Sequence, residues 1–466
     1  MEDMSSSIKI MMNPKNVAIV GASSNPDKVG YSILKNYLDL GYKGKIYPVN
    51  IKEESILGLK VYKSVLDIPE PVDVVVVAVP APLVPNIIDE CGRAKSKTVV
   101  VVTAGFAEVG EVELEKKLVE TANKYNLPVL GPNCVGVMDL GSGVDTLFLP
   151  AYKFDRPGIG TLGFASQSGS VAGNILDVIG GENLGLSKFI SYGNASIINE
   201  TDILNYFADD EDTKVLVFYL EGAKRGKEFI EAVKRIGVKK PVIIAKGGET
   251  EAGAQAAHSH TASLTGNYQV YDAIFKQYGF IHSNNLDEII SLAKIFDKQP
   301  LVTGNRVGLI TNGGGTGVLA TDALYNNGLV LADLTQESKD YLRKVMPPIV
   351  NIRTPLDIGG DADYARFNDA IKTVLNDDNV DVLAIIALFQ TPGADSKVAQ
   401  AICNYSVNSK KPIVVISDGG SYTQTHKKII ESSGIPVYSS PEMAAKSISA
   451  LINYAKYKEA ASKLYE

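Results

Sequence analysis

Three times along the chain, a short apolar run is followed directly by a turn of small and polar residues and then by a helical stretch. The runs cover residues 16–20, 161–165 and 306–310, and the turns after them begin at Gly21, Ser166 and Thr311. Apolar runs of this length between turn signals are typical of strands buried in a parallel sheet. Because strands that alternate with helices favour doubly wound sheets, we predict an α/β chain with three Rossmann-like or flavodoxin-like parallel-sheet domains.

The length of the chain agrees with this organisation, since 466 residues correspond to about three domains of ordinary size. Residues 141–158 are irregular and residues 299–305 are polar, so we expect both stretches to be connections between domains. The predicted domain limits are therefore 1–145, 146–298 and 299–466.

Composition and charge argue against several classes of protein. The chain has 46 basic and 53 acidic residues, a net charge of −7, and no basic block that would suit nucleic acid. The three cysteines (Cys91, Cys134 and Cys403) lie far apart without a CxxC pair, and no metal-ligand cluster is visible. The first residues do not resemble a secretory signal, and no apolar run approaches the roughly 18 residues of a membrane span. We expect a cytoplasmic protein that binds neither nucleic acid, membrane nor a metal of its own.

The predicted strand ends of the first domain carry short motifs that suit a phosphate-bearing ligand. Small residues after the first strand let backbone N–H groups and a helix N-terminus approach phosphate oxygens. The turn after this strand lacks G-x-G-x-x-G, and the second strand ends in Asn50 and Lys52, where NAD binding would need an acid. These two side chains suit the phosphorylated ribose of coenzyme A, and the 2′-phosphate of NADP is the alternative.

A long polar segment, residues 246–266, follows the apolar run 241–245 and contains His258 and His260. Its other residues are nearly all Gly, Ala, Ser and Thr, so the segment has few side chains with which to anchor itself in a core. A polar loop of about 20 residues between α/β elements is long enough to indicate function. It suits a loop that carries a nucleophilic imidazole and moves; on this stretch alone, a surface loop with incidental histidines fits as well.

Two turns and one carboxylate in the later domains add candidate sites for an anion. Ser168 is a candidate N-cap, and the small residues around it leave first-turn N–H groups open to an anion, an attraction of about 0.3–1 kcal/mol at an exposed surface. Residues 359–362 precede another helix, whose first turn we also expect to be bare. Glu221 follows the predicted strand 214–219 and lies where ligands of such sheets gather, so it could fix the tautomer of a histidine.

Several of these segments resemble a known superfamily. The first-domain motifs resemble the CoA-binding domain of the succinyl-CoA synthetase superfamily, with G-P-N-C-x-G at 131–136 the most specific of them. Ser259-His260-Thr261 matches the segment around the phosphohistidine of NDP-forming acyl-CoA synthetases, and residues 166–169 resemble their S-x-S-G motif. The segment L-D-I-G-G at 356–360 resembles the part of the superfamily that precedes a second phosphate-facing helix. In this order, the parts resemble the alpha subunit of ADP-forming acetyl-CoA synthetases over nearly the whole chain.

The resemblance implies roles for individual residues. His260 would carry the phosphoryl group and Glu221 would orient its ring, with His258 as the rival nucleophile. The implied phosphate-binding residues are Ser166, Ser168, Gly169, Ser170, Gly359, Gly360, Asp361 and Ala362. The implied CoA-binding residues are Gly21, Ala22, Ser23, Ser24, Lys28, Asn50, Lys52, Val79, Pro80, Thr103, Ala104, Gly105 and Asn133. Ala262 stands where the family usually has glycine, which removes freedom at positive φ if the loop needs it.

The resemblance also implies ligands and a partner. The expected reaction interconverts acyl-CoA, ADP and phosphate with carboxylic acid, ATP and CoA through an acyl phosphate. No ATP-grasp module follows residue 466 and no G-x-x-x-x-G-K-[ST] loop occurs, so ADP or ATP with Mg²⁺ is expected on a beta subunit with an ATP-grasp domain, in an alpha2-beta2 heterotetramer. The alternatives are a non-catalytic CoA-binding regulatory or scaffold protein, a lysine acetyltransferase and an NADP oxidoreductase.

Overall fold

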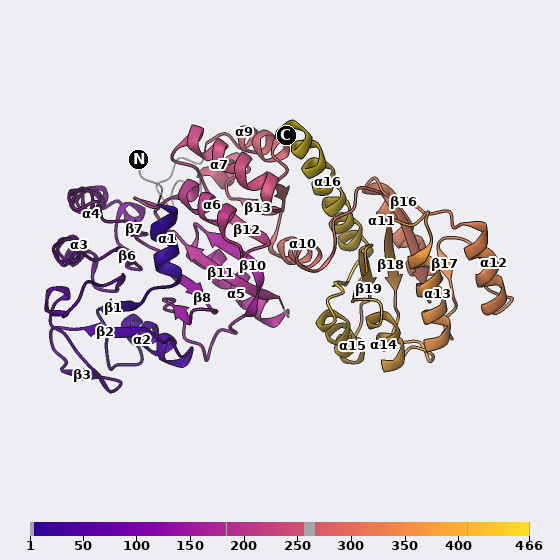
Figure 1. Cartoon of the computed structure of the whole chain (residues 1–466), viewed down its shortest axis with the longest axis horizontal. Coiled ribbons are helices and arrows are strands. Elements are labelled where there is room, and N and C mark those ends of the chain that lie inside the picture. Colours follow the sequence, from indigo (N-terminus) through magenta and orange to yellow (C-terminus); the bar gives the residue numbers. More distant parts are fainter. Residues whose placement is uncertain (1–3, 183, 256–265, 408, 466) are drawn as a thin grey trace. The chain divides into compact units, whose positions relative to one another are not determined.

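The structure is a computed structural model that describes residues 4–182, 184–255, 266–407 and 409–465. It divides into two compact units, Met1–Asn284 and Asn285–Glu466, and each is described by itself (Figure 1). His258 and His260 lie outside the described residues. Within the described residues, no helix combines the length and the apolarity that crossing a membrane requires.

The first sheet of the first unit is parallel throughout. Its order is β2 (Lys45–Val49), β1 (Asn16–Val20), β5 (Val74–Val77), β6 (Thr98–Val101) and β7 (Val129–Leu130). The helices α2 (Val29–Asp39), α3 (Val84–Arg93) and α4 (Val112–Lys124) connect these strands, and a small hairpin, β3 (Ser55–Ile56) with β4 (Leu59–Lys60), follows β2. All four valines of β5 are fully buried, as expected of a parallel sheet with both faces covered.

The second sheet of the first unit has a parallel centre and an antiparallel edge. Its order is β14 (Ile281–His282), β13 (Val242–Lys246), β12 (Val215–Leu220), β10 (Gly158–Ser166), β11 (Gly185–Ser191), β8 (Val137–Asp139) and β9 (Val144–Asp145). Its helices are α5 (Gly169–Gly181), α6 (Glu200–Asp209), α7 (Gly226–Lys239) and α9 (Tyr268–Gln277). β8 runs antiparallel to β11, and β9 runs antiparallel to β8.

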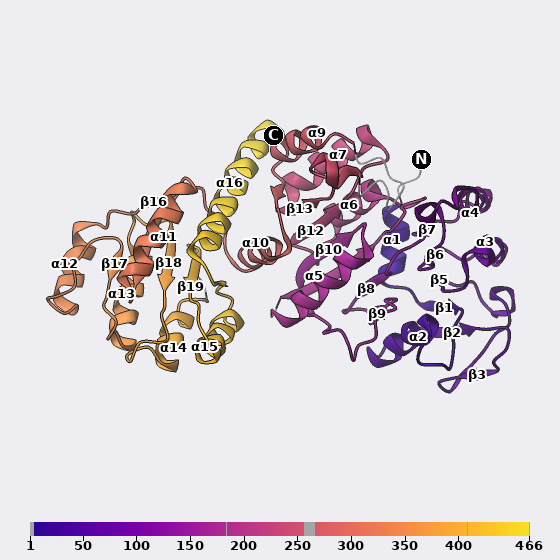
Figure 2. The same ribbon diagram turned by 180° about the vertical axis from the view of Figure 1, so that it is seen from behind.

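The two sheets of the first unit are joined by residues 131–136. The backbone N–H groups of Ser191, Asn194 and Ser196 donate to the carbonyl oxygens of Gly136, Pro132 and Gly131 at 2.9–3.1 Å. Helix α1 (Ser5–Met12) contacts α6, β8 and β6, and in both views it lies between the strands of the two sheets (Figures 1 and 2). The G-P-N-C segment is therefore a structural junction as well as a strand end.

A close backbone contact at this junction leads to a prediction for stability. Gly193 has φ +50°, and a Cβ there would lie 2.2 Å from the carbonyl oxygen of Asn133. We expect Gly193→Ala to lower the free energy of unfolding of the first unit by about 1–3 kcal/mol or more, because neither backbone can yield. The control is Gly226→Ala, where nothing lies within 4 Å of the added Cβ. Thermal unfolding followed by circular dichroism measures both, and equal shifts of the two midpoints would contradict the prediction.

The second unit holds a third sheet, which is parallel. Its order is β16 (Val330–Leu331), β15 (Arg306–Thr311), β18 (Val382–Ile386), β19 (Ile413–Ile416) and β20 (Val437–Tyr438), and β17 (Leu356–Asp357) pairs with the end of β15. The helices are α10 (Leu286–Lys298), α11 (Gly314–Asn326), α12 (Gln336–Val345), α13 (Tyr364–Asn376), α14 (Ser396–Cys403), α15 (Ser421–Ser432) and α16 (Pro441–Tyr465). α16 packs against α10 and α11.

The predicted α/β class with doubly wound sheets is confirmed, with two differences in detail. The stretch 141–158 is not wholly irregular, because Val144 is buried and β9 pairs with β8. The second sheet is not purely parallel, because β8 and β9 add an antiparallel edge.

Strands β8 and β9 belong to the second sheet although they precede residue 146, and α10 belongs to the second unit although it precedes residue 299. The domain limits 145 and 298 stay an interpretation of the sequence.

Candidate active site

The strand-end turns of the first sheet meet at its carboxyl edge, which is where ligands of such sheets bind. Hydrogen bonds join each turn to its neighbour. The N–H of Gly21 donates to Val49 O at 3.0 Å, Thr103 Oγ1 donates to Val79 O at 2.8 Å, and the N–H of Asn133 donates to Thr103 O at 2.9 Å. The residues predicted from the five strand ends therefore belong to one continuous rim.

The turn after β1 approaches the next strand closely. Gly21 has φ +93°, and a Cβ at this position would lie 2.4 Å from Ala78 O. The following helix, α2, begins at Val29 after Lys28, and no side chain caps it. The N–H groups of Val29 and Gly30 thus have no side-chain cap, whereas the N–H of Tyr31 donates to Lys28 O at 3.0 Å. An uncapped helix N-terminus is the kind of site that binds phosphate.

The polar side chains of this rim divide into two kinds. Asn50 orders the turns, because its Nδ2 donates to Ala22 O at 2.8 Å and its Oδ1 accepts from the N–H of Lys52 at 2.7 Å. Lys28, directly before α2, and Lys52, two residues after Asn50, are both exposed. Ser24 is already engaged, since its N–H donates to Glu53 Oε1 at 3.0 Å. The rim therefore offers the charges of two lysines to an anionic ligand, whereas most N–H groups of residues 21–28 already donate within the protein.

The turn between β10 and α5 is held against the end of β12. Ser168 is the N-cap of α5, as predicted, and its hydroxyl accepts from the N–H of Val171 at 3.5 Å. Between the two predicted serines, Gln167 accepts from the N–H groups of Glu221 at 2.8 Å and Gly222 at 3.3 Å through its Oε1. The structure thus brings the α5 N-terminus and Glu221 together, and the residue that links them was missed from the sequence.

Glu221 is buried, with 5% of its surface exposed, and its surroundings include another missed residue. Lys246, the last residue of β13, donates from Nζ to Glu221 O at 2.6 Å and lies 4.9 Å from the centre of the Tyr271 ring. Burial lowers the pKa of Lys246 to about 8 although the Glu221 charge opposes the shift. Burial, with the adjacent Glu221 carboxylate, raises the pKa of Tyr219 to about 12. The sequence offered one signal for Lys246, which is a basic residue at the first position of the polar segment 246–266.

Described residues before and after the two histidines, His258 and His260, contact one imidazole ring, that of His282. Glu249 Oε1 lies 2.9 Å and Tyr268 Oη 3.2 Å from Nε2 of His282 on β14. Because Glu249 precedes His258 and His260 in the chain and Tyr268 follows them, both ends of the segment contact the same imidazole ring. His282 itself is the last residue of β14.

The predicted phosphate turn of the second unit differs from expectation. The first turn of α13 is not bare, because Asp363 caps it by accepting from the N–H of Arg366 at 3.1 Å. Asp361 binds the Arg366 guanidinium at 2.6 Å, and that hydrogen bond lowers the pKa of Asp361. Gly359 has φ +86°, and Ala362 is buried. Gly359, Gly360, Asp361 and Ala362 therefore form a tight turn that already contains an ion pair.

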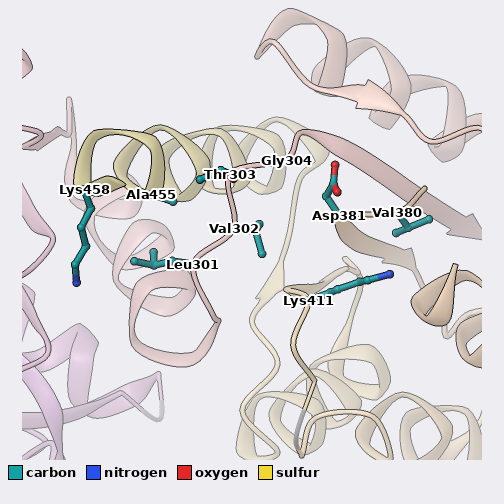
Figure 3. A pocket seen from close by; sticks show the side chains of 9 residues that line it. All are labelled: Leu301, Val302, Thr303, Gly304, Val380, Asp381, Lys411, Ala455 and Lys458. Carbon is teal, nitrogen blue, oxygen red and sulfur yellow. The ribbon is translucent and has the colours of Figure 1, made fainter. Parts of the chain in front are cut away.

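A cavity of about 440 Å³ in the second unit lies away from these turns. Asp381 and Lys411 lie on one side of it, and Lys458 of α16 lies on the other (Figure 3). Asp381 precedes β18 and Lys411 precedes β19, so the cavity is at the amino edge of the parallel sheet, opposite the edge where ligands bind. Among the described residues, no group of three or more His, Cys, Asp and Glu side chains could hold a metal ion.

Comparison with protein families divides the chain into three matched regions. Residues 15–139 match a CoA binding domain, residues 159–296 match the succinyl-CoA ligase like flavodoxin domain, and residues 307–464 match a ligase-CoA domain.

Similar proteins cover nearly the whole chain. The alpha subunit of acetate–CoA ligase (ADP-forming) II of Pyrococcus furiosus is 40% identical over 95% of this chain and 97% of its own length. Acetate–CoA ligase (ADP-forming) of Methanocaldococcus jannaschii is 40% identical over 97% of this chain, which spans 64% of that longer relative. The solved structure of dinucleotide forming acetyl-coenzyme A synthetase 1 of Ca. Korarchaeum cryptofilum, in complex with phosphate and ADP, has a TM-score of 0.93 and 35% identity and covers 98% of this chain and 99% of that one.

Proposed function

The chain belongs to the family of ADP-forming acetate–CoA ligases, and we propose on this premise that it is the CoA- and phosphoryl-carrying subunit of an acyl-CoA synthetase. In the direction of ATP synthesis, a phosphate oxygen attacks the thioester carbonyl of acyl-CoA, and CoA leaves as the thiolate. A nitrogen of His260 then attacks the phosphorus of the acyl phosphate, and the carboxylate leaves. ADP takes the phosphoryl group from the histidine and becomes ATP.

The observation that carries this proposal is the contact of Gln167 with the backbone of Glu221 and Gly222. It supports a site in which the α5 N-terminus, with Ser166, Ser168, Gly169 and Ser170, stabilises the phosphoryl oxygens beside the carboxylate that orients His260. Preformed N–H donors of this kind typically contribute about 3–4 kcal/mol each to stabilising developing negative charge. Gly359, Gly360, Asp361 and Ala362 are proposed to form a second phosphate-binding turn. The N–H groups of Gly359 and Ala362 already donate to Asp357 Oδ1 and Gly359 O, so the backbone contact with phosphate is proposed for Gly360 and Asp361.

The rim of the first sheet is the proposed CoA site. The uncapped N–H groups at the start of α2 suit the pyrophosphate, and Lys28 and Lys52 suit the phosphorylated ribose. Asn50 is proposed to face the ligand and also to hold the turn. The second role is supported by the hydrogen bonds of its side-chain amide to Ala22 and Lys52. The turns at Val79, Thr103 and Asn133 complete the rim.

We propose that the nucleotide and its Mg²⁺ are bound by a partner subunit. The similar alpha subunit of Pyrococcus furiosus has about the length of this chain, whereas the Methanocaldococcus jannaschii relative is longer than the chain, which spans 64% of it. A beta subunit with an ATP-grasp domain would supply the remaining functions, in an alpha2-beta2 assembly. The reaction is proposed to take place in the cytoplasm, which suits the three free cysteines (Cys91, Cys134 and Cys403) of the described residues.

The test combines binding with turnover. We expect the chain, assembled with its partner subunit, to form ATP from acetyl-CoA, ADP and phosphate, and the chain to bind CoA but not NADP in calorimetry. CoA binding without any ATP formation in the assembled complex would favour a regulatory or scaffold protein instead. Binding of NADP in preference to CoA would contradict the assignment of the rim.

A further inference from the structure

The turn after β11 contains a buried amide that touches several segments of the first unit. Asn194 is 8% exposed. Its Nδ2 donates to Glu108 Oε2 at 2.7 Å and to Glu115 Oε2 at 2.8 Å, and its Oδ1 accepts from Asn133 Nδ2 at 3.2 Å. Both N–H groups and the oxygen of the side-chain amide are thus used, which is the arrangement that makes a buried amide costly to remove.

On one side, this network fixes the turns of the proposed CoA rim. Glu108 accepts from the N–H groups of Gly105 at 2.5 Å and Phe106 at 3.1 Å. Although burial raises the pKa of Glu108, the hydrogen bonds from Asn194 and from these N–H groups lower it overall, so the carboxylate stays charged. Asn133 is itself a rim residue, and its N–H donates to Thr103 O.

On the other side, the network reaches the segment that follows Glu221. Lys224 Nζ donates to the backbone oxygen of Asn194 at 2.7 Å, and the N–H of Lys224 donates to Glu200 Oε1 at 2.7 Å. Glu200 is fully buried, and burial raises its pKa. Burial lowers the pKa of Lys224, while the charges of Glu115 and Glu200 oppose that shift. The segment 221–224 is therefore attached to the same turn as the CoA rim.

We propose that Asn194 is a positioning residue that holds the turns of the CoA rim in register with the strand end that carries Glu221. This rests on the proposed function, in which an acyl phosphate made at the rim must meet a histidine oriented by Glu221. A misplacement of about 1 Å between reacting groups can cost about 100-fold in rate. Asn194 acts through Glu108, Asn133 and Lys224, and it need not touch a reactant.

Two half-reactions of the assembled complex separate this role from a general loss of structure. One transfers label to the chain from acetyl-CoA and ³²P-phosphate and needs the CoA rim. The other transfers label from γ-³²P-ATP with Mg²⁺ and does not need the rim. We expect Asn194→Ala to slow the first by about 10-fold to 100-fold and to leave the second within about twofold, because the backbone oxygen used by Lys224 is retained.

The matched control is Asn36→Ala. Asn36 is another buried asparagine of this unit, and its Nδ2 donates to Leu147 O at 2.6 Å, outside the network. We expect this variant to change both half-reactions equally or not at all. If Asn194→Ala fails to fold by circular dichroism, Asn194→Ser decides the test in its place. An equal loss of both half-reactions in a folded Asn194 variant, or no loss in either, overturns the proposal. Failure of the proposed function is distinguishable, because the unaltered chain would then take label from neither donor.

Discussion

Replacing His260 with alanine is expected to abolish the formation of ATP from acyl-CoA, ADP and phosphate by the assembled complex. In the proposed reaction the phosphoryl group passes through a covalent bond to this imidazole, and alanine offers no nucleophile to replace it. The same variant should take no label from γ-³²P-ATP, because both donors converge on one nitrogen. Rapid-quench labelling with ³²P measures each half-reaction, and the label on the unaltered chain should be labile in acid and stable in base.

The matched control for this experiment lies two residues away in the same segment. His258→Ala removes an identical ring from the neighbouring position, so we expect it to retain labelling from both donors. If His258→Ala abolished labelling and His260→Ala retained it, the assignment of the nucleophile would be reversed. Full ATP synthesis by His260→Ala would end the proposal of a phosphohistidine at this position.

Replacing Glu221 with glutamine is expected to slow both half-reactions by at least about 100-fold, because exchanging a histidine-orienting carboxylate for its amide can cost up to about 10⁴-fold in kcat. Glutamine keeps the size of the side chain and the backbone N–H that donates to Gln167. It removes the charge that stabilises a protonated ring and selects one tautomer. The fall should therefore appear in kcat for labelling, with little change in the affinity for CoA.

Glu211→Gln is the control for this change of charge. Glu211 is exposed and precedes β12, whereas Glu221 follows it, so the two residues lie at opposite edges of the same sheet. We expect Glu211→Gln to leave both half-reactions within about twofold, as is usual for surface positions away from a site. Parallel losses in the two variants would mean that net charge, and not the orientation of a histidine, explains the effect.

The elements that could be predicted from the sequence are those whose signal is local. The runs 16–20, 161–165 and 306–310 lie in β1, β10 and β15, because apolar residues between turn signals mark buried strands. Ser168 was recognised as an N-cap for the same local reason. The N-cap Asp363 has an equally local signal, because aspartate is a preferred residue at a helix N-terminus. Only the expectation of a bare first turn, which rested on the glycines before it, was wrong.

The relations that could not be predicted depend on contacts between distant residues. Gln167 and Glu221 are 54 positions apart, and nothing near either residue indicates the other. Asn194 and Glu108 are 86 positions apart. β8 and β9 are short strands, and β8 pairs with β11, which begins 46 residues after Asp139. Pairings of this kind emerge only when the sheets are packed.

The contacts of His282 with Glu249 and Tyr268 would limit how far a phosphoryl group travels on His260, if the proposed reaction is correct. His260 stands eight residues before Tyr268, and eight residues of fully extended chain span at most about 29 Å. While Tyr268 stays in place, the Cα of His260 therefore lies within about 29 Å of the Cα of Tyr268, and a nucleotide that receives the phosphoryl group must lie within the reach of the imidazole side chain from that sphere. The length of this stretch of chain therefore bounds the distance of both the thioester and the nucleotide from Tyr268, whatever geometry the assembled subunits adopt.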